Sequence, residues 1–578
     1  MNFLRNPFMT AYKNRIYPNV WDMVALLFAF GLIALLAWDA KQMSAPYHLG
    51  QAITISLNPH HLPGYALRTV LRMLIALLFS LLFTFIFGTW AAKNKRAGRI
   101  IIPIIDICQS IPILGFLSVA IVGFISLFPG SMLGPECAAI LAIFTSQAWN
   151  MALGFYQTVR SVPIELREAA NMFHLSAWQR FWRIDVPFSM PGLLWNMMMS
   201  MSAGWFFVVA SEAVSVSNQQ ILLPGIGSYI AYAIQTMNMR AIGYAILTMF
   251  IVILIYDQFL FRPLIAWAEK FKAEQVAAER EPNSWLINLL HRTRLLRLLG
   301  NQINQLFDSI VNLSWLRSKP AIYHPPSIRY KRLMHTLLNA SLAVILFSLV
   351  IYSVYFIARN IPLTSVGHIF FLGGITALRV FILIIVCSLI WVPVGVWIGL
   401  RPNIAHVIQP VVQFLAAFPV NLLYPLVVIL IVKYHLNVEI WVTPLMILGV
   451  QWYVLFNVIA GASVLPKDLL QVTDNLGATG WLRWRRLILP GIFPYYMTGA
   501  ITAVGGAWNA SIAAEVIEWG QTKLAATGLG AYISQSTNKG DFLHMAVGIA
   551  VMCILVLFFN RVLWRPLYVI AETRYQLD

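Results

Sequence analysis

Long apolar stretches recur along the whole chain and are separated by short polar segments. About twelve of them come close to the ~20 residues that a helix needs to cross the hydrocarbon core of a membrane. The first six lie near 21–38, 68–90, 100–128, 137–155, 191–214 and 241–261, and the other six near 333–357, 373–399, 405–431, 439–458, 491–514 and 542–560. This pattern predicts an all-α polytopic membrane protein of about 12 transmembrane helices.

Composition and charge support this interpretation. Hydrophobic residues make up 59% of the chain and charged residues only 11%, whereas soluble proteins carry about 25% charged residues. Lys and Arg gather in alternate polar segments, which predicts that those segments and both termini are cytoplasmic. These segments are 1–20, 91–99, 156–190, 262–332, 401–404, 459–490 and 561–578. Anionic membrane lipid then accounts for the net charge of +18, and nucleic-acid binding is excluded because no soluble basic domain is present.

The chain contains an internal duplication. Up to the third predicted helix of each set, matching residues lie 307 positions apart, as in Arg72 and Arg379. From the fourth helix onward the distance is 303, as in Trp205 and Trp508 or Glu212 and Glu515. A constant offset over this length indicates two homologous units. Because each unit has an even number of spans, both copies have the same orientation and can enclose a pathway between them.

The duplication divides the chain into five parts. Residues 1–66 form an N-terminal arm, the first span and an outer loop, and residues 67–270 form the first repeated unit with a polar loop at 156–190. Residues 271–332 are a cytoplasmic amphipathic linker, for which we expect a helix along the membrane surface or a plain tether. Residues 333–372 form the seventh span and an outer loop, and residues 373–578 form the second unit with its polar loop at 459–490.

The polar loops carry a repeated pattern. In the first loop, Glu168, Ala169 and Ala170 are followed by His174 and then by Pro187; in the second, Gln471, Val472 and Thr473 are followed by Gly477 and Pro490. This spacing resembles the loop of permeases from bacterial binding-protein-dependent ABC importers, which reads Glu-Ala-Ala, three residues, Gly, nine residues and Ile-x-Leu-Pro. Each copy keeps a different part of that pattern.

The resemblance implies a type I ABC importer fold and a role for these ten loop residues. In the family, this loop forms the coupling helix that sits in a groove of the ATPase subunit. It further implies two copies of an ATPase subunit at the cytoplasmic face, a periplasmic or lipid-anchored substrate-binding protein, and a location in the bacterial inner membrane. The chain has no Gly-x4-Gly-Lys-Ser/Thr run, so we expect no cofactor here, no enzymatic activity, and ATP with Mg bound by the partner subunits.

The second copy is similar to the nitrate, sulfonate, taurine and bicarbonate branch of the family. The similarity rests on the stretch from Leu476 to Ile501, on Ala513 to Glu515, and on the residues from Ala526 onward. It implies ATP-driven import of a small anionic solute, with the chain supplying the translocation pathway.

Six residues are candidates for that pathway. Trp205 and Glu212, like Trp508 and Glu515, lie two helical turns apart and share a helix face. An acid in a span is costly and usually faces a cavity or a partner, so these pairs line the pathway or, alternatively, bond to the loop that follows. Arg72 and Arg379 could bind an oxyanion, because the guanidinium group matches its geometry; alternatively, they anchor their helices. Pro112 and Pro419 predict broken helices whose backbone groups line a pathway or simply shape the helix.

Two other classes of protein remain open. A secondary active transporter, coupled to an ion gradient, also uses two parallel six-helix halves, but it needs embedded ionisable groups rather than matched docking loops. A membrane scaffold that has lost its pore would show degraded loops in both copies. The four cysteines fall within or beside predicted spans, which favours small core side chains over a metal site.

Overall fold

The computed structural model describes residues 20–47, 53–216, 219–268, 292–313, 355–519 and 522–574, with a few isolated positions between them. The chain forms two compact units, which are described separately. The first comprises Met1–Gln42, Gly154–Asn196 and Ile255–Pro325; the second comprises Met43–Leu153, Met197–Leu254 and Pro326–Asp578.

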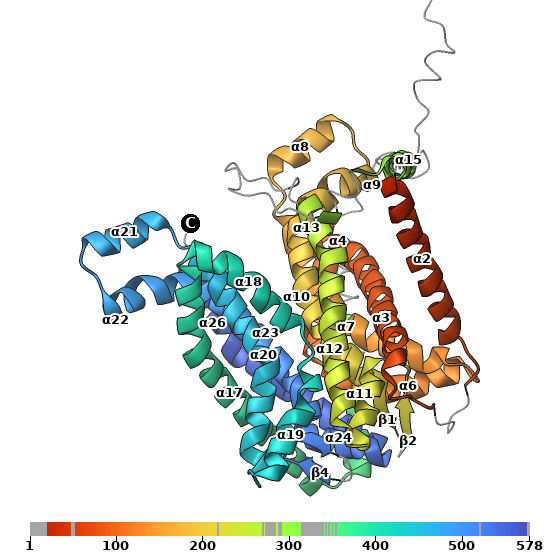
Figure 1. Cartoon of the computed structure of the whole chain (residues 1–578). Helices are drawn as coiled ribbons and strands as arrows, with labels where there is room; N and C mark the ends of the chain where they lie inside the picture. Colours follow the sequence, from red (N-terminus) through yellow and green to blue (C-terminus); the bar gives the residue numbers. More distant parts are fainter. Residues whose placement is uncertain are drawn as a thin grey trace, which may run out of the picture. The chain divides into compact units, whose positions relative to one another are not determined.

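Helices dominate both copies of the duplication and follow the same order (Figure 1). The first copy contains α2 (Val20–Met43), α3 (Leu62–Phe83), α4 (Thr89–Lys93), α5 (Lys95–Ser110), α6 (Ile113–Leu127), α7 (Leu133–Arg160), α10 (Val186–Glu212), α11 (Ile226–Gln235), α12 (Met239–Tyr256) and α13 (Arg262–Ala268). The second contains α17 (Leu363–Gly399), α18 (Pro402–Ala417), α19 (Tyr424–Lys433), α20 (Val438–Ser463), α23 (Leu489–Ala514), α24 (Leu529–Lys539), α25 (Phe542–Phe559) and α26 (Arg565–Arg574). The predicted all-α membrane fold is confirmed.

Eight helices of the described chain are long and apolar enough to cross a membrane, and ten if each of two bent helix pairs counts as one span. Of the twelve predicted spans, the first coincides with α2. The seventh, near 333–357, lies largely outside the described residues. The described helices therefore agree with the prediction that the spans form two similar sets.

The two bent pairs occur where the sequence places Pro112 and Pro419. The pair α5 and α6 bends by 87° and the pair formed by α18 with the segment Val420–Lys433 by 69°. Ile111, before the first proline, is extended with φ −75° and ψ 127°, because the proline ring disfavours helical geometry in the residue that precedes it. The helices are broken as the sequence predicts.

A short hairpin follows the long helix α10 and another follows α23. β1 (Ala213–Val216) pairs antiparallel with β2 (Gln219–Leu222), and β3 (Val516–Trp519) pairs with β4 (Thr522–Ala525). Both hairpins have the same register at positions that the duplication relates. Each returns the chain to a short helix, α11 or α24, whose first turn approaches the end of the preceding long helix.

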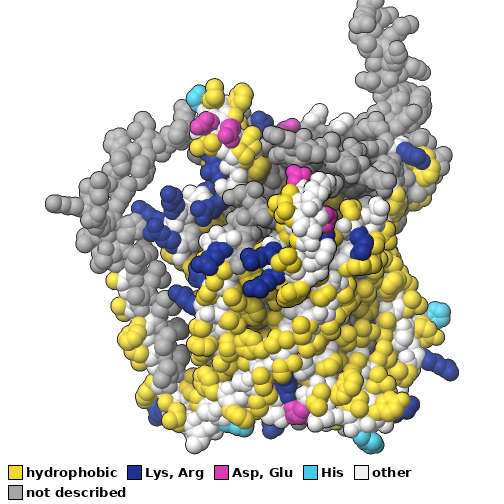
Figure 2. Space-filling view, turned by 90° about the vertical axis from the view of Figure 1, so that its left-hand side faces the viewer, with side chains coloured by type: hydrophobic (Ala, Val, Ile, Leu, Met, Phe, Trp, Pro, Cys, Tyr) yellow, Lys and Arg dark blue, Asp and Glu magenta, His cyan; other side chains and the backbone are white. Residues whose placement is uncertain are grey.

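Apolar side chains fill the interior of the second unit and also cover its surface. Leu383, Met446 and Ala500 are fully buried between α17, α20 and α23. Large apolar residues such as Leu389 on α17 are exposed, and Figure 2 shows a broad surface of hydrophobic side chains. An apolar surface of this extent is typical of a chain that contacts lipid.

Candidate functional site

The two polar loops fold in the same way. The first contains α8 (Ile164–Met172), α9 (Ala177–Arg180) and the π-helical turn η3 (Phe181–Asp185); the second contains α21 (Lys467–Asn475), α22 (Gly480–Arg483) and the π-helical turn η8 (Trp484–Ile488). Pro163 directly precedes α8, and Pro466 directly precedes α21. Proline is favourable at the start of a helix, because the first N–H groups of a helix have no partner within it.

A left-handed residue ends both loop helices. His174 has φ 50° and Gly477 has φ 65°. In each case the next backbone N–H reaches back to close the last turn: Leu175 donates to the carbonyl of Ala170 at 3.0 Å, and Ala478 donates to that of Thr473 at 2.9 Å. This bond pattern is a helix-ending motif that favours glycine. The glycine of the family pattern therefore reflects the left-handed backbone geometry that this position needs. In the first loop His174 adopts the same geometry.

An arginine holds the rest of each loop against its helix. Arg180 donates to Asn171 at 2.7 Å, and Arg483 donates to Asp474 at 2.6 Å. The donors and acceptors occupy positions that the duplication relates. The two loops thus share a fold although they share few residues of the Glu-Ala-Ala pattern.

The remaining pattern residues take different environments. Glu168, Gln471 and Val472 are exposed, Ala169 and Thr473 are half-buried, and Ala170 is buried. Pro187 and Pro490 lie in the first turns of α10 and α23, directly after the π-helical turns. A proline in a continuous helix lacks a hydrogen-bond donor, and a π-helical turn is one way to absorb the resulting misfit. Each loop therefore continues into a long apolar helix through a π-helical turn.

Two exposed apolar residues in the loops were missed from the sequence. The side chains of Phe173 and Leu476 are each 77% exposed, and the duplication relates their positions. Met172 beside Phe173 is also exposed. An apolar side chain that protrudes from a polar loop is typical of a surface that a protein partner covers. The signal was present in the sequence as an apolar residue repeated just before His174 and Gly477.

The linker contacts the first loop within the first unit. Its helix α15 (Arg294–Val311) was predicted as amphipathic, and Ile303, Leu306 and Ile310 are exposed along it. Gln179 donates to Asn312 at 3.0 Å, and the rings of Trp182 and Phe307 meet edge to face at 5.2 Å. The linker therefore braces the first loop; the prediction that α15 lies on a membrane surface stays a prediction.

We expect Gly477→Val to loosen the end of α21, because a β-branched side chain in left-handed geometry costs about 1–2 kcal/mol. No atom lies within 4 Å of a Cβ added there, so the cost comes from the backbone alone. Hydrogen exchange on the purified chain should show amides of Lys467–Asn475 exchanging about tenfold faster. Gly477→Asn is the control, since asparagine tolerates this geometry; equal exchange in both variants would contradict the assignment.

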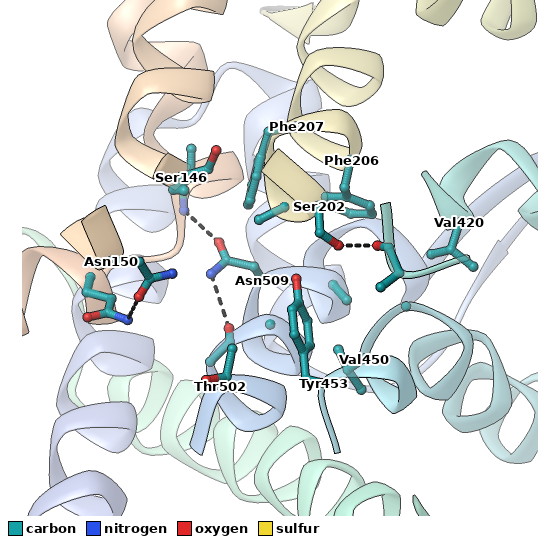
Figure 3. A pocket seen from close by; sticks show the side chains of 18 of the residues that line it. Ser146, Asn150, Ser202, Phe206, Phe207, Val420, Val450, Tyr453, Thr502 and Asn509 are labelled. Atoms are coloured by element: carbon teal, nitrogen blue, oxygen red, sulfur yellow. Dashed lines mark hydrogen bonds between the residues drawn. The ribbon is translucent and has the colours of Figure 1, made fainter. Parts of the chain in front are cut away.

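A cavity of about 130 Å³ lies within the second unit, between the two copies (Figure 3). It has room for several water-sized groups. Its walls come from equivalent positions in both copies, which include the pairs Gln109 and Ala416, Ile113 and Val420, Ser146 and Gly449, Asn150 and Tyr453, Ser202 and Gly505, and Phe206 and Asn509. A cavity that two repeats line at equivalent positions agrees with a pathway between them.

Hydrogen bonds cross between the copies beside this cavity. The backbone N–H of Ile113, at the start of α6, donates to the Asn509 carboxamide oxygen at 2.8 Å. Asn421 donates to the carbonyl of Phe206 at 3.2 Å, and the Ser202 hydroxyl donates to the carbonyl of Ala416. The broken helices are thus tied to the long helices of the opposite copy.

A buried ion-pair cluster joins four helices of the first copy. The guanidinium of Arg72 donates to both oxygens of Glu136, at 2.5 and 2.7 Å, and to Glu212 at 2.6 Å. Glu212 also accepts from Thr69 at 2.7 Å and from the backbone N–H of Gly227 at 2.6 Å. A Cβ on Gly225 would lie 2.3 Å from the Glu212 carboxylate. The cluster therefore fixes α3, α7, α10 and the start of α11 to one another.

The second copy repeats the cluster with one difference. Arg379 pairs with Glu515 at 3.0 Å and with Glu439, and Thr376 donates to Glu515 at 2.9 Å. Glu439 also accepts from the backbone N–H of Thr527 at 2.7 Å, and 44% of its side chain is exposed, against 1% for Glu136. Sequence reasoning missed Glu136 and Glu439, although they too lie 303 positions apart.

The structure thus places the six pathway candidates away from the cavity wall. Glu212, Glu515, Arg72 and Arg379 belong to the clusters, and Trp205 and Trp508 are buried at 1% and 3% exposure. None of the six lines the cavity described above. Among the residues that the structure describes, no three His, Cys, Asp or Glu side chains come together to hold a metal ion.

Comparison with known proteins gives the same division of the chain. The model of the family "Binding-protein-dependent transport system inner membrane component" matches residues 84–260 and again 391–565. The two matches contain the loops and most of the cavity wall, and together they cover more than half of the chain.

Curated relatives are transport permeases. The bicarbonate transport system permease protein CmpB of Synechococcus elongatus is 29% identical over 134 residues, or 23% of this chain and 46% of the relative. The taurine permease TauC of Escherichia coli is 27% identical over 180 residues (31% and 61%), and the nitrate import permease NrtB of Synechocystis is 25% identical over 158 residues (27% and 52%). The chain spans about half the length of most of these relatives.

The repeated family match agrees with the matched loops and with the shared order of helices. The chain is therefore a duplicated permease that belongs to the family of inner membrane components of binding-protein-dependent transport systems, the ABC importers.

Proposed function

We propose that this chain forms the whole membrane pathway for ATP-driven uptake of a small anionic solute. The carrying observation is the pair of loops, which have the same fold, an exposed apolar residue at equivalent positions and the same π-helical turn into a long helix. Two such surfaces on one chain fit two copies of an ATPase subunit, and no second permease subunit is then needed.

The remaining parts of the proposal follow from the family. ATP and Mg are bound by the partner subunits, and a periplasmic or lipid-anchored binding protein delivers the solute. The chain lies in a bacterial inner membrane with both termini and both loops cytoplasmic. The bicarbonate, taurine and nitrate relatives support an anionic solute.

Cysteine cross-linking tests the docking surfaces. Phe173→Cys and Leu476→Cys, labelled in membranes of the source cells with a maleimide that carries a benzophenone and then irradiated, should each yield a product with the same ATPase subunit. Lys539→Cys is the control, because Lys539 ends α24 at the far end of the second copy from α21 (Figure 1). If no ATPase is captured and uptake instead collapses with the ion gradient, the secondary-transporter alternative holds.

A further inference from the structure

Helix α15 of the linker exposes one continuous apolar face. Four apolar residues follow the spacing i, i+3, i+4 and i+7, which places side chains on one side of a helix; they are Ile303, Leu306, Phe307 and Ile310. Their side chains are 41% to 64% exposed. The polar residues Asn301, Gln305 and Asp308 occupy the opposite side and are exposed as well. The helix therefore has an apolar face and a polar face of ordinary amphipathic character, and both are accessible.

The last turn of α15 is bonded to the first polar loop. The indole N–H of Trp178 donates to the carbonyl of Ile310 at 3.4 Å, and Arg183 donates to the side chain of Asn312 at 3.3 Å. These bonds add to the one from Gln179 and to the ring contact described above. Whatever holds α15 in place therefore also holds this loop.

The second loop exposes the surface that the linker covers in the first. Trp481 corresponds to Trp178, and Leu482 corresponds to Gln179. The side chains of Trp481 and Leu482 are 71% and 55% exposed, whereas that of Gln179 is only 7% exposed and Trp178 is half-buried. The two loops share a fold, but they differ in what supports them.

The place of α15 in the first unit indicates a lipid surface as the partner of its apolar face. Figure 1 shows α15 nearly end on, close to the Val20 end of α2, while α2 runs in the plane of the picture. Because α2 coincides with the first predicted span, a helix at its end that runs in another direction lies where a membrane surface is expected. Amphipathic helices in such a position bury the apolar face at the boundary between headgroups and acyl chains.

Charge selects the kind of lipid. Arg292, Arg294 and Arg297 precede α15 or lie in its first turn, and Asp308 is the one acid between residues 292 and 313. Basic residues beside an interfacial helix are attracted by the anionic lipids of the cytoplasmic leaflet. The segment thus combines an apolar face with an excess of positive charge, which matches an anionic phospholipid surface.

We propose that the apolar face of α15 binds the anionic cytoplasmic surface of the membrane and thereby positions the first polar loop. This inference rests on the proposed function, which places both loops at the cytoplasmic face. It adds a regulation that acts on one loop: anionic phospholipid orders the first loop through α15 and leaves the second unaffected.

Fluorescence quenching in nanodiscs tests whether the apolar face meets lipid. The purified chain, without any ATPase, has its four cysteines replaced by alanine, namely Cys108, Cys137, Cys387 and Cys553. Ile303→Cys or Gln305→Cys then carries an environment-sensitive fluorophore. Spin-labelled lipid should quench the fluorophore about threefold more strongly in Ile303→Cys, because the two positions lie on opposite faces of an interfacial helix. Replacing phosphatidylglycerol by phosphatidylcholine should weaken this quenching.

Hydrogen exchange in the same nanodiscs tests the consequence for the loop. Leu306→Asp should release the helix from lipid, because a carboxylate is costly to desolvate, and amides of residues 164–180 should then exchange about fivefold faster. Omitting phosphatidylglycerol should have the same effect on the wild-type chain. Residues 467–483 of the second loop are the internal control and should not change. Gln305→Asp is the matched control, since it adds the same charge to the polar face and should change neither loop.

Each outcome bears on one claim. Equal quenching at the two positions would overturn the lipid contact, and so would a change at Ile303→Cys that appears only when the ATPase is added, because the ATPase would then be the occupant. Equal changes of the two loops in Leu306→Asp, or none, would overturn the positioning role. Neither measurement needs ATPase or solute. If the loops capture no ATPase while both expected results appear, the lipid contact stands and the proposed energy coupling fails.

Discussion

Arg72→Met is expected to destabilise the folded chain by about 3–5 kcal/mol, because it leaves two carboxylates, Glu136 and Glu212, buried without a counter-charge. The purified protein in detergent should unfold at a much lower temperature. Combining Arg72→Met with Glu136→Gln and Glu212→Gln should recover most of the loss, since the amides remove the charges and keep oxygen acceptors.

Two comparisons make this result specific. Arg262→Met breaks an ion pair in which 48% of the arginine side chain is exposed, so it should cost no more than about 1 kcal/mol. Arg379→Met should cost less than Arg72→Met, because water reaches the half-exposed Glu439. Equal losses for Arg72→Met and Arg262→Met would show that the buried cluster does not support the fold.

Replacing Phe173 and Leu476 together by Asp is expected to abolish ATP-driven uptake. Each side chain is 77% exposed beside the residue that ends the loop helix, and a carboxylate there would have to be desolvated beneath an ATPase subunit. Each single variant should retain part of the activity, since the other loop is intact. The measurement is ATP-dependent uptake of labelled solute by membrane vesicles with their native partners.

The duplication supplies the control for this experiment. Phe173→Leu places in the first loop the residue that the second loop has, and Leu476→Phe does the reverse, so both should preserve uptake. If the double Asp variant transports normally, or if Phe173→Leu fails as completely as Phe173→Asp, these side chains do not form the docking surfaces.

Much of the fold follows from the sequence because its signals are local. Length and hydropathy predict the spans, and Pro112 and Pro419 predict the broken helices, since a proline acts on its own neighbours along the chain. The loops were recognised from residue spacing. Their close similarity was less evident, because it resides in backbone geometry at His174 and Gly477 and in the bonds of Arg180 and Arg483.

The ion-pair clusters depend on contacts that no local pattern encodes. Arg72 meets Glu136 and Glu212 across 64 and 140 positions of sequence. The offset of 303 between Glu136 and Glu439 could have drawn attention to them, but only packing shows which acid faces which arginine. The cavity was missed for a similar reason. Gln109, Asn150 and Asn509 are single polar residues in apolar runs, and they line the same cavity only because of how the helices pack.

The central claim is that one chain supplies both halves of an importer's membrane pathway and engages two ATPase subunits. Native mass spectrometry of the complex, purified through a tag on this chain in mild detergent, tests it most directly. The predicted result is one copy of the chain with two copies of one ATPase, reduced to the chain alone when Phe173 and Leu476 are both Asp. Recovery of the wild-type chain without any ATPase, or as a dimer that shares two ATPases, would contradict it.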